Sequence, residues 1–148
     1  MADEVRVAID SDSDLVTARA EARAMAERLG FPRPDPTLIA TAISEVARNI
    51  VVHAGHGEIV LAPFEDAERY GLVVTATDKG AGIRDVDAAL RDEHSGRSGL
   101  GLGLPGARRL MDEFDITSDA DSGTTVTMRK WRYHDELARL REERRRRG

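Results

Sequence analysis

The chain keeps its helical and its strand-like patterns in separate stretches, and this separation restricts the folds open to it. Apolar residues recur every three to four positions in two early segments, and they alternate with polar residues in later, paired segments. Helices followed by paired strands are typical of α+β architectures rather than of doubly wound sheets. We predict strands at residues 5–10, 58–64, 70–78, 114–118 and 124–131, and helices at 11–30, 37–54, 104–112 and 133–147.

Length and composition exclude several classes of protein. The 148 residues suit one domain, and the absence of cysteine excludes a disulfide scaffold, a thiolate metal site and a cysteine nucleophile. No apolar run approaches the ~20 residues that a membrane span needs. The acidic start of the chain does not resemble a secretory signal. We therefore expect a soluble, cytoplasmic protein with no membrane partner.

Charge is distributed unevenly along the chain. The formal net charge is −5. From Arg129 onward the chain has nine basic and four acidic residues, so this tail carries +5 and the rest of the chain carries −10. A basic tail can bind nucleic acid or an acidic partner, although most such tails are simply solvated. The acidic body offers no broad surface for DNA, so we expect no nucleic-acid partner.

The second predicted helix presents a line of polar residues. Glu45, Asn49 and His53 are four positions apart and so share one face, beside an apolar stripe formed by Ile39, Ile43, Val46 and Ile50. A carboxylate, a carboxamide and an imidazole in line can polarise water and hold a hard cation such as Mg²⁺, which favours oxygen ligands. A solvated helix face is the alternative explanation.

A second candidate lies where the strand at residues 70–78 ends. Asp78 shares a strand face with the apolar residues Leu72, Val74 and Ala76, so its carboxylate points inward and needs a partner, for which an adenine amino group is suited. Gly80 and Gly82 follow and let the backbone approach a flat ligand. An ordinary turn would have the same composition.

A run of alternating glycines at residues 99–106 precedes the third helix. Glycine-rich backbone at a helix start presents amides to phosphate. The run contains G-x-G-x-x-G, but a polar segment rather than a buried strand precedes it, so a Rossmann site is excluded. No Walker A motif occurs. The loop at residues 79–98 is long enough to be a lid or a binding loop.

The fourth candidate is Thr124, at the start of the last strand. It shares a strand face with Val126 and Met128, so its hydroxyl points inward, where it could bind a base edge or a water. A β-branched residue with a purely structural role is equally typical of a strand.

Together and in this order, the four candidates resemble the Bergerat-fold (GHKL) ATPases, the superfamily of gyrase and the sensor histidine kinases. The resemblance covers residues 5–131, and it is closest to the RsbT-like switch-protein serine kinases of the bacterial stressosome. Residues 14–31, 41–50 and 99–114 carry this closer resemblance. It implies a two-layer α/β sandwich with a mixed, mostly antiparallel sheet, helices on one face, and ATP bound between the layers. Residues 132–148 form a basic extension outside this domain.

The resemblance implies a role for each matching residue. Glu45 is the general base toward a protein serine, and Asn49 ligates Mg²⁺ together with the phosphates of ATP. Asp78 accepts a hydrogen bond from the adenine amino group, and Thr124 supports Asp78 beside the adenine. The other implied nucleotide contacts are His53, Gly80 and Gly82 at the base, Arg97 at the γ-phosphate, and Gly99, Leu100, Gly101 and Gly103 at the phosphates.

The implied activity is ATP-dependent phosphorylation of a serine on a STAS-domain antagonist, followed by binding and activation of a PP2C-type phosphatase. Two alternatives stay open. One is an anti-sigma factor kinase that holds a sigma factor, and the other is a nucleotide-gated binding module without catalysis. The sequence leaves a homodimer open as well.

Overall fold

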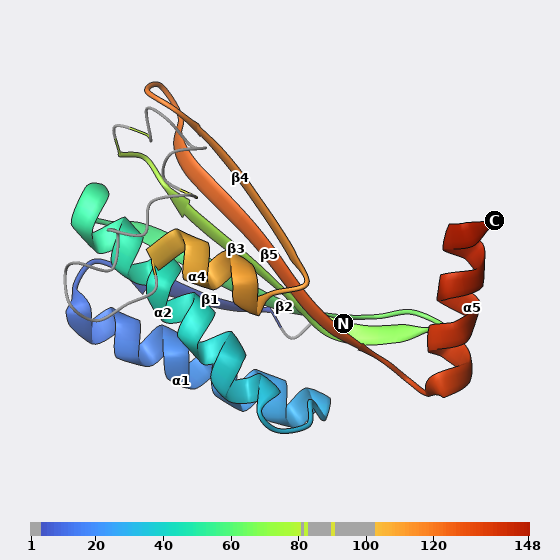
Figure 1. Cartoon of the computed structure of the whole chain (residues 1–148). Coiled ribbons are helices and arrows are strands. Elements are labelled where there is room, and N and C mark those ends of the chain that lie inside the picture. The colour runs from blue at the N-terminus through green and yellow to red at the C-terminus, as the bar shows by residue number, and fades with distance from the viewer. Residues whose placement is uncertain (1–3, 81, 83–89, 91–102) are drawn as a thin grey trace.

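The protein is a two-layer α/β sandwich in the computed structural model, which describes residues 4–80, 82, 90 and 103–148 (Figure 1). Five strands form one sheet in the order β1-β2-β3-β5-β4, and each neighbouring pair among them is antiparallel. The strands are β1 (Val5–Ile9), β2 (Gly57–Glu65), β3 (Arg69–Asp78), β4 (Glu113–Asp119) and β5 (Gly123–Tyr133). The helices are α1 (Asp12–Leu29), α2 (Asp35–His53), α4 (Gly103–Leu110) and α5 (Glu136–Arg147). The predicted α+β class is confirmed.

Three helices cover one face of the sheet. Figure 1 shows α1, α2 and α4 on the same side, while α5 lies beyond the end of the sheet. The apolar stripe of α2 is fully buried against inward-facing strand residues, as strand alternation requires. The core is built from large aliphatic side chains, among them Ile9, Ile39, Ile43, Ile50, Ile59, Leu61, Leu72 and Met128.

The first helix ends where its sequence signals predicted. The Asp14 carboxylate accepts hydrogen bonds from the amides of Asp10 and Ser11, at 2.8 and 3.1 Å, and so satisfies backbone donors at the start of α1. Gly30 adopts φ +89°, the left-handed conformation that closes a helix at low steric cost.

The last strand and the last helix differ from the prediction. We predicted a strand ending at residue 131 and a helix starting at 133, but β5 runs to Tyr133, where Arg132 pairs with Tyr70 and Tyr133 with Arg69. The helix begins only at Glu136, because the Asp135 carboxylate accepts a hydrogen bond from the Ala138 amide at 2.7 Å and caps it.

Within the residues that the structure describes, no helix combines the length and the apolar character that crossing a bilayer requires.

Candidate functional site

Asp78 and Thr124 meet at one end of the sheet. They are register partners on β3 and β5, and their exposed fractions are only 8% and 4%. Oδ1 of Asp78 accepts a hydrogen bond from the amide of Gly80 at 2.9 Å, and within the described part of the chain no donor contacts Oδ2. A carboxylate accepts several hydrogen bonds, so Asp78 has the capacity for a further donor besides the Gly80 amide. The inward orientation predicted for both side chains is confirmed.

Glycines allow three backbone segments to converge on Asp78. A Cβ on Gly80 would lie 2.7 Å from Cβ of Ala54, at the end of α2. A Cβ on Gly82, which has φ +81°, would lie 2.4 Å from the carbonyl oxygen of Asp119 in the β4–β5 hairpin. Gly123 is closer still, because its Cβ would lie 2.1 Å from the carbonyl oxygen of Asp78. The segment after β3 thus contacts both α2 and the hairpin.

Hydrogen bonds to the Asp119 carboxylate stabilise the turn of the β4–β5 hairpin. The Ser122 hydroxyl, together with the amides of Ser122 and Asp121, holds the pKa of Asp119 below its usual value by hydrogen bonding to the carboxylate. The turn that positions Gly123 is therefore fixed by a charged acceptor.

The polar line on α2 runs from the core to the solvent. Glu45 is 6% exposed, Asn49 is half-buried and His53 is exposed. An oxygen of Glu45 accepts a hydrogen bond from the amide of Gly103 at 2.9 Å, and Arg48 lies 3.5 Å away. The carboxylate is thus desolvated yet hydrogen-bonded, which excludes the solvated-face explanation for this residue.

Gly103 begins α4, which therefore includes the second half of the glycine run at residues 99–106. The C-terminal end of α4 is anchored to β5, because Nζ of Lys130 donates to the carbonyl of Leu110 at 3.0 Å and the amide of Trp131 donates to Asp112 at 2.8 Å. The N-terminal end faces Glu45. The Gly103 amide points toward α2, and the start of a helix is suited to binding an anionic group.

The two parts of the site lie on the same end of the molecule. Gly57, the register partner of Asp78, lies so close to α2 that a Cβ there would be 2.8 Å from Cγ2 of Ile50. The last turns of α2, which include Asn49 and Ile50, therefore lie beside the strand ends at Gly57 and Asp78. Four predicted residues fall outside the described residues: Arg97, Gly99, Leu100 and Gly101.

Ser118 is a site residue that the sequence analysis missed. Its hydroxyl lies 2.7 Å from that of Thr124, and the two residues are register partners on β4 and β5. Ser118 alternates with the half-buried Phe114 and Ile116, so the two-residue period of the strand was the signal that could have identified it.

These residues fit a nucleotide and a phosphate-bound cation. The Asp78 carboxylate suits an exocyclic amine, and the glycines beside it let the surrounding backbone segments pack closely around this carboxylate. Asn49 offers a carboxamide oxygen at the helix that Glu45 also occupies, a donor of the type that Mg²⁺ accepts alongside phosphate and water.

Comparison with known proteins gives a consistent result. The family model of the histidine kinase-like ATPase domain matches residues 9–130. The chain is 44% identical over 131 residues to serine/threonine-protein kinase RsbT of Bacillus subtilis, covering 88% of this chain and 98% of that protein. It is 33% identical over 111 residues to the anti-sigma F factor of Pasteuria penetrans, covering 65% of this chain and 71% of that protein.

A solved structure supports the fold alone. The crystal structure of the SiaB–SiaC complex from Pseudomonas aeruginosa matches with a TM-score of 0.55 and 14% identity, covering 89% of each chain. The family match and the RsbT similarity go further than the fold. The chain belongs to the histidine kinase-like ATPase family and, within it, to the RsbT-like serine/threonine-protein kinases.

Proposed function

We propose that this protein uses ATP and Mg²⁺ to phosphorylate a serine on a STAS-domain antagonist in a bacterial partner-switching module. Released from the antagonist, it then binds and activates a PP2C-type phosphatase. The proposal rests on the similarity to RsbT and, above all, on one contact: the buried Glu45 holds the first amide of α4, the helix that includes the second half of the glycine run. A base and an anion-binding helix start are thereby adjacent.

The mechanism assigns one task to each part of the site. Asp78 accepts a hydrogen bond from the adenine amino group. The hydroxyls of Thr124 and Ser118 contact each other and hold the neighbouring strand surface in place. Asn49 would hold Mg²⁺, and the bound ion would supply neutralisation of phosphate charge. Glu45 accepts the hydroxyl proton of the substrate serine. The serine oxygen bonds to the γ-phosphorus, while the bond from this phosphorus to the bridging oxygen breaks and ADP leaves. Such transfer depends mostly on positioning and charge neutralisation.

Intact-mass spectrometry tests the activity directly. A STAS-domain protein encoded beside this one is incubated with the full chain and Mg-ATP. We expect a gain of one phosphate that maps to serine and that Asn49→Ala abolishes, whereas the exposed-site control Asp115→Asn leaves it intact. If the wild-type chain binds ATP and yet no partner gains phosphate, the kinase assignment for this substrate class is wrong.

The anti-sigma relatives favour a second candidate function. Anti-sigma F factors of Pasteuria penetrans and Oceanobacillus iheyensis match at 33% and 29% identity. In this alternative the protein holds a sigma factor and phosphorylates an anti-anti-sigma protein. Binding assays with purified sigma factors separate the two, because only the anti-sigma function requires a nucleotide-dependent complex with a sigma factor. Either function places the protein in the cytoplasm. Sedimentation measures whether the protein forms a homodimer.

A nucleotide-gated binder without catalysis is the remaining possibility. It predicts that a partner binds in the presence of ATP and never gains phosphate, and that Glu45→Ala leaves partner binding unchanged.

A further inference from the structure

The helix α5 is an addition to the family domain. The family model ends at residue 130, and α5 spans Glu136–Arg147. Figure 1 shows α5 beside the start of β3, whereas Asp78 ends the same strand. Ten residues of strand separate the two ends, a distance of about 30 Å. Whatever α5 does, its surface is remote from the nucleotide site.

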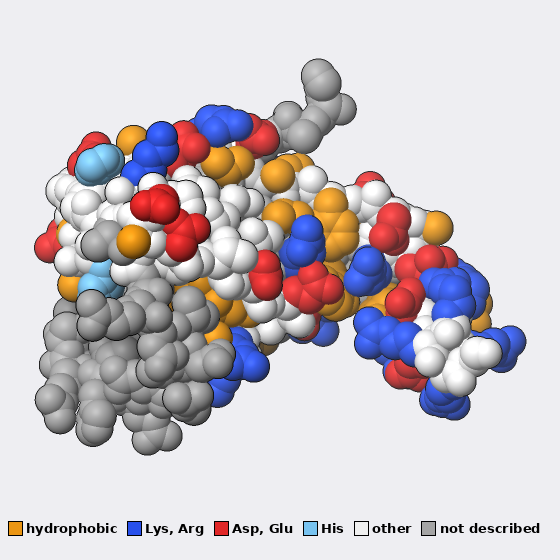
Figure 2. Space-filling view, turned by 90° about the horizontal axis from the view of Figure 1, so that it is seen from above, with side chains coloured by type: hydrophobic (Ala, Val, Ile, Leu, Met, Phe, Trp, Pro, Cys, Tyr) orange, Lys and Arg blue, Asp and Glu red, His pale blue; other side chains and the backbone are white. Residues whose placement is uncertain are grey.

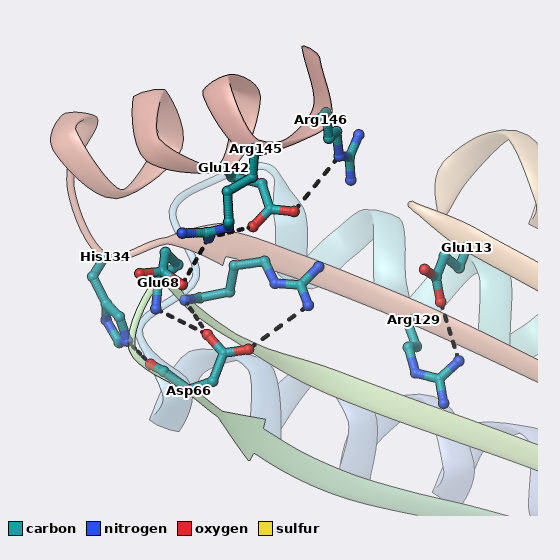
Figure 3. A network of polar contacts seen from close by, with 9 residues as sticks. Asp66, Glu68, Glu113, Arg129, His134, Glu142, Arg145 and Arg146 are labelled. Atoms are coloured by element: carbon teal, nitrogen blue, oxygen red, sulfur yellow. Dashed lines mark hydrogen bonds and ion pairs between the residues drawn. The ribbon is translucent and has the colours of Figure 1, made fainter. Parts of the chain in front are cut away.

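One face of α5 is fixed to the body. Ala138 is 1% exposed, and Arg145 and Arg141 contact the carboxylate of Glu68 in the β2–β3 turn at 2.9 and 3.6 Å. Just before the helix, a ring nitrogen of His134 lies 3.0 Å from the carbonyl oxygen of Asp66. Figure 3 shows Arg145 on Glu68 and His134 on Asp66 side by side. The orientation of the helix, and so of its outer face, is therefore set.

The outer face carries a stripe with coiled-coil spacing. We call the four residues Leu137, Leu140, Arg144 and Arg147 the outer stripe; they follow one another at intervals of three, four and three. The two leucines are 66% and 44% exposed, and the Arg147 side chain is 81% exposed. Figure 2 shows the C-terminal lobe standing apart from the body and covered by charged side chains. The stripe is apolar in its first half and basic in its second.

This pattern selects one kind of occupant. Parallel pairing of two copies would oppose Arg144 and Arg147 to themselves, and antiparallel pairing would set leucines against arginines. The helix is net basic, with six arginines against three glutamates, but a nucleic-acid backbone offers no apolar partner for the two exposed leucines, and two leucines give little apolar area to bury in a lipid surface. A partner helix with leucines and then carboxylates at the same spacing matches both the apolar and the basic half of the outer stripe. We propose that the outer stripe docks an amphipathic, acidic helix of a partner protein.

A designed peptide tests the proposal with the full chain. The probe is a labelled helical peptide with two leucines and two glutamates at successive a and d positions, made in both polarities, and binding is read by fluorescence anisotropy. We expect one polarity to bind, more weakly at high salt because the arginine–glutamate contacts are screened. Exchanging the glutamates for lysines should abolish binding. If neither polarity binds, the proposal is wrong.

Paired variants locate the contact. Leu137→Ser with Leu140→Ser, and separately Arg144→Glu with Arg147→Glu, should each weaken peptide binding at least tenfold. The matched control is Val16→Ser with Arg23→Glu on α1, where Val16 is 57% exposed, and it should bind like wild type. The Arg→Glu pair should instead bind the lysine peptide, since the charges are then exchanged.

Three outcomes would overturn the assignment. The first is peptide binding that the stripe variants leave unchanged. The second is self-association of the wild-type chain in sedimentation that the leucine variant abolishes, which would make the occupant a second copy. The third is binding to anionic vesicles or to RNA at least as tight as to the peptide. Circular dichroism of each variant confirms that α5 and the domain stay folded.

Discussion

Glu45 accepts a hydrogen bond from the Gly103 amide, and its carboxylate is buried there. In the proposed function a phosphate group would use the same amide, so bound phosphate and Glu45 would compete for one donor. We expect Glu45→Gln to lower phosphoryl transfer by ~10²–10⁴-fold, the usual contribution of a general base. The same variant should bind ATP at least as tightly as wild type, because a negative charge leaves the phosphate site. Label transfer and calorimetry measure the two effects, with the exposed Glu58→Gln as control. Equal transfer by the variant would remove Glu45 from the base role.

In the proposed function, Asp78 is the residue on which adenine recognition would depend. Asparagine at this position would present an amide donor to the adenine amino group in place of an acceptor, or else turn its donor toward the Gly80 amide. We expect Asp78→Asn to weaken ATP binding by ~1–3 kcal/mol, the cost of an ill-matched buried polar pair. Calorimetry measures it, and Asp121→Asn in the exposed hairpin turn serves as control. An unchanged ATP affinity would contradict the adenine assignment.

Single residues differ in how far the sequence predicts them. The inward faces of Asp78 and Thr124 followed from the two-residue period of a strand, which depends only on neighbours in the chain. The contact between Glu45 and Gly103 joins residues 58 positions apart, and that between Asp35 and Arg132 joins residues 97 apart. Such contacts depend on how elements pack, so no local pattern indicates them. The roles of these residues in nucleotide binding and transfer stay predictions.

At the scale of elements, the β4–β5 hairpin depends on one glycine. Gly123 has φ +82°, and a Cβ there would lie 2.1 Å from the carbonyl oxygen of Asp78, so Gly123→Ala adds backbone overlap to the ~1–2 kcal/mol cost of the left-handed conformation. Gly55→Ala is the matched control, because Gly55 has φ +86° with nothing within 4 Å of its Cβ.

Thermal unfolding and ATP titration compare these two variants. We expect Gly123→Ala to have the lower melting temperature and to lose ATP affinity, since the overlap pushes β5 away from Asp78. Gly55→Ala should lose stability only. Indistinguishable variants would mean that the approach of the two strands is not tight.

The start of α2 is held by an ion pair between the buried Asp35 and the half-exposed Arg132 near the end of β5. Arg132 donates to both oxygens of Asp35 at 2.6 and 2.9 Å; this bonding raises the pKa of Arg132, and Asp35 is only 1% exposed. Arg132→Ala leaves that carboxylate buried without its partner, at a cost of about 1–3 kcal/mol. The half-exposed Arg132 side chain favours the lower end of this range.

The exposed pair on the same strand provides the control. Arg129 contacts Glu113 at 3.1 Å, with both side chains about half exposed, so Arg129→Ala should change the free energy of unfolding by less than about 1 kcal/mol. Urea denaturation measures both variants. Equal losses would show that the burial of Asp35 contributes nothing.

For the molecule as a whole, the sequence predicted the class and the order of elements, whereas the domain boundary at residue 131 stays a prediction. The separate helical and strand-like patterns of apolar residues, and the glycines at the ends of elements, place helices and strands correctly because both are local signals. The predicted boundary at residue 131 was taken from a family resemblance, and it falls inside β5, which continues for two more residues. Those two residues pair with β3, and one of them, Arg132, holds α2 through Asp35.

Two truncated chains test where the folding unit ends. A chain ending at residue 131 loses two strand pairings and the Asp35–Arg132 ion pair, so its unfolding midpoint should fall clearly. A chain ending at residue 134 keeps these contacts and the hydrogen bond from the His134 amide to the Glu68 carbonyl at 2.8 Å, and it loses only α5. It should melt close to wild type and bind ATP with the same affinity, because α5 lies at the opposite end of β3 from Asp78. Calorimetric unfolding and ATP titration of the two chains measure this. If the 134-residue chain loses ATP affinity, α5 supports the nucleotide site as well as the surface beside the β2–β3 turn, and the tail is not a separate binding element.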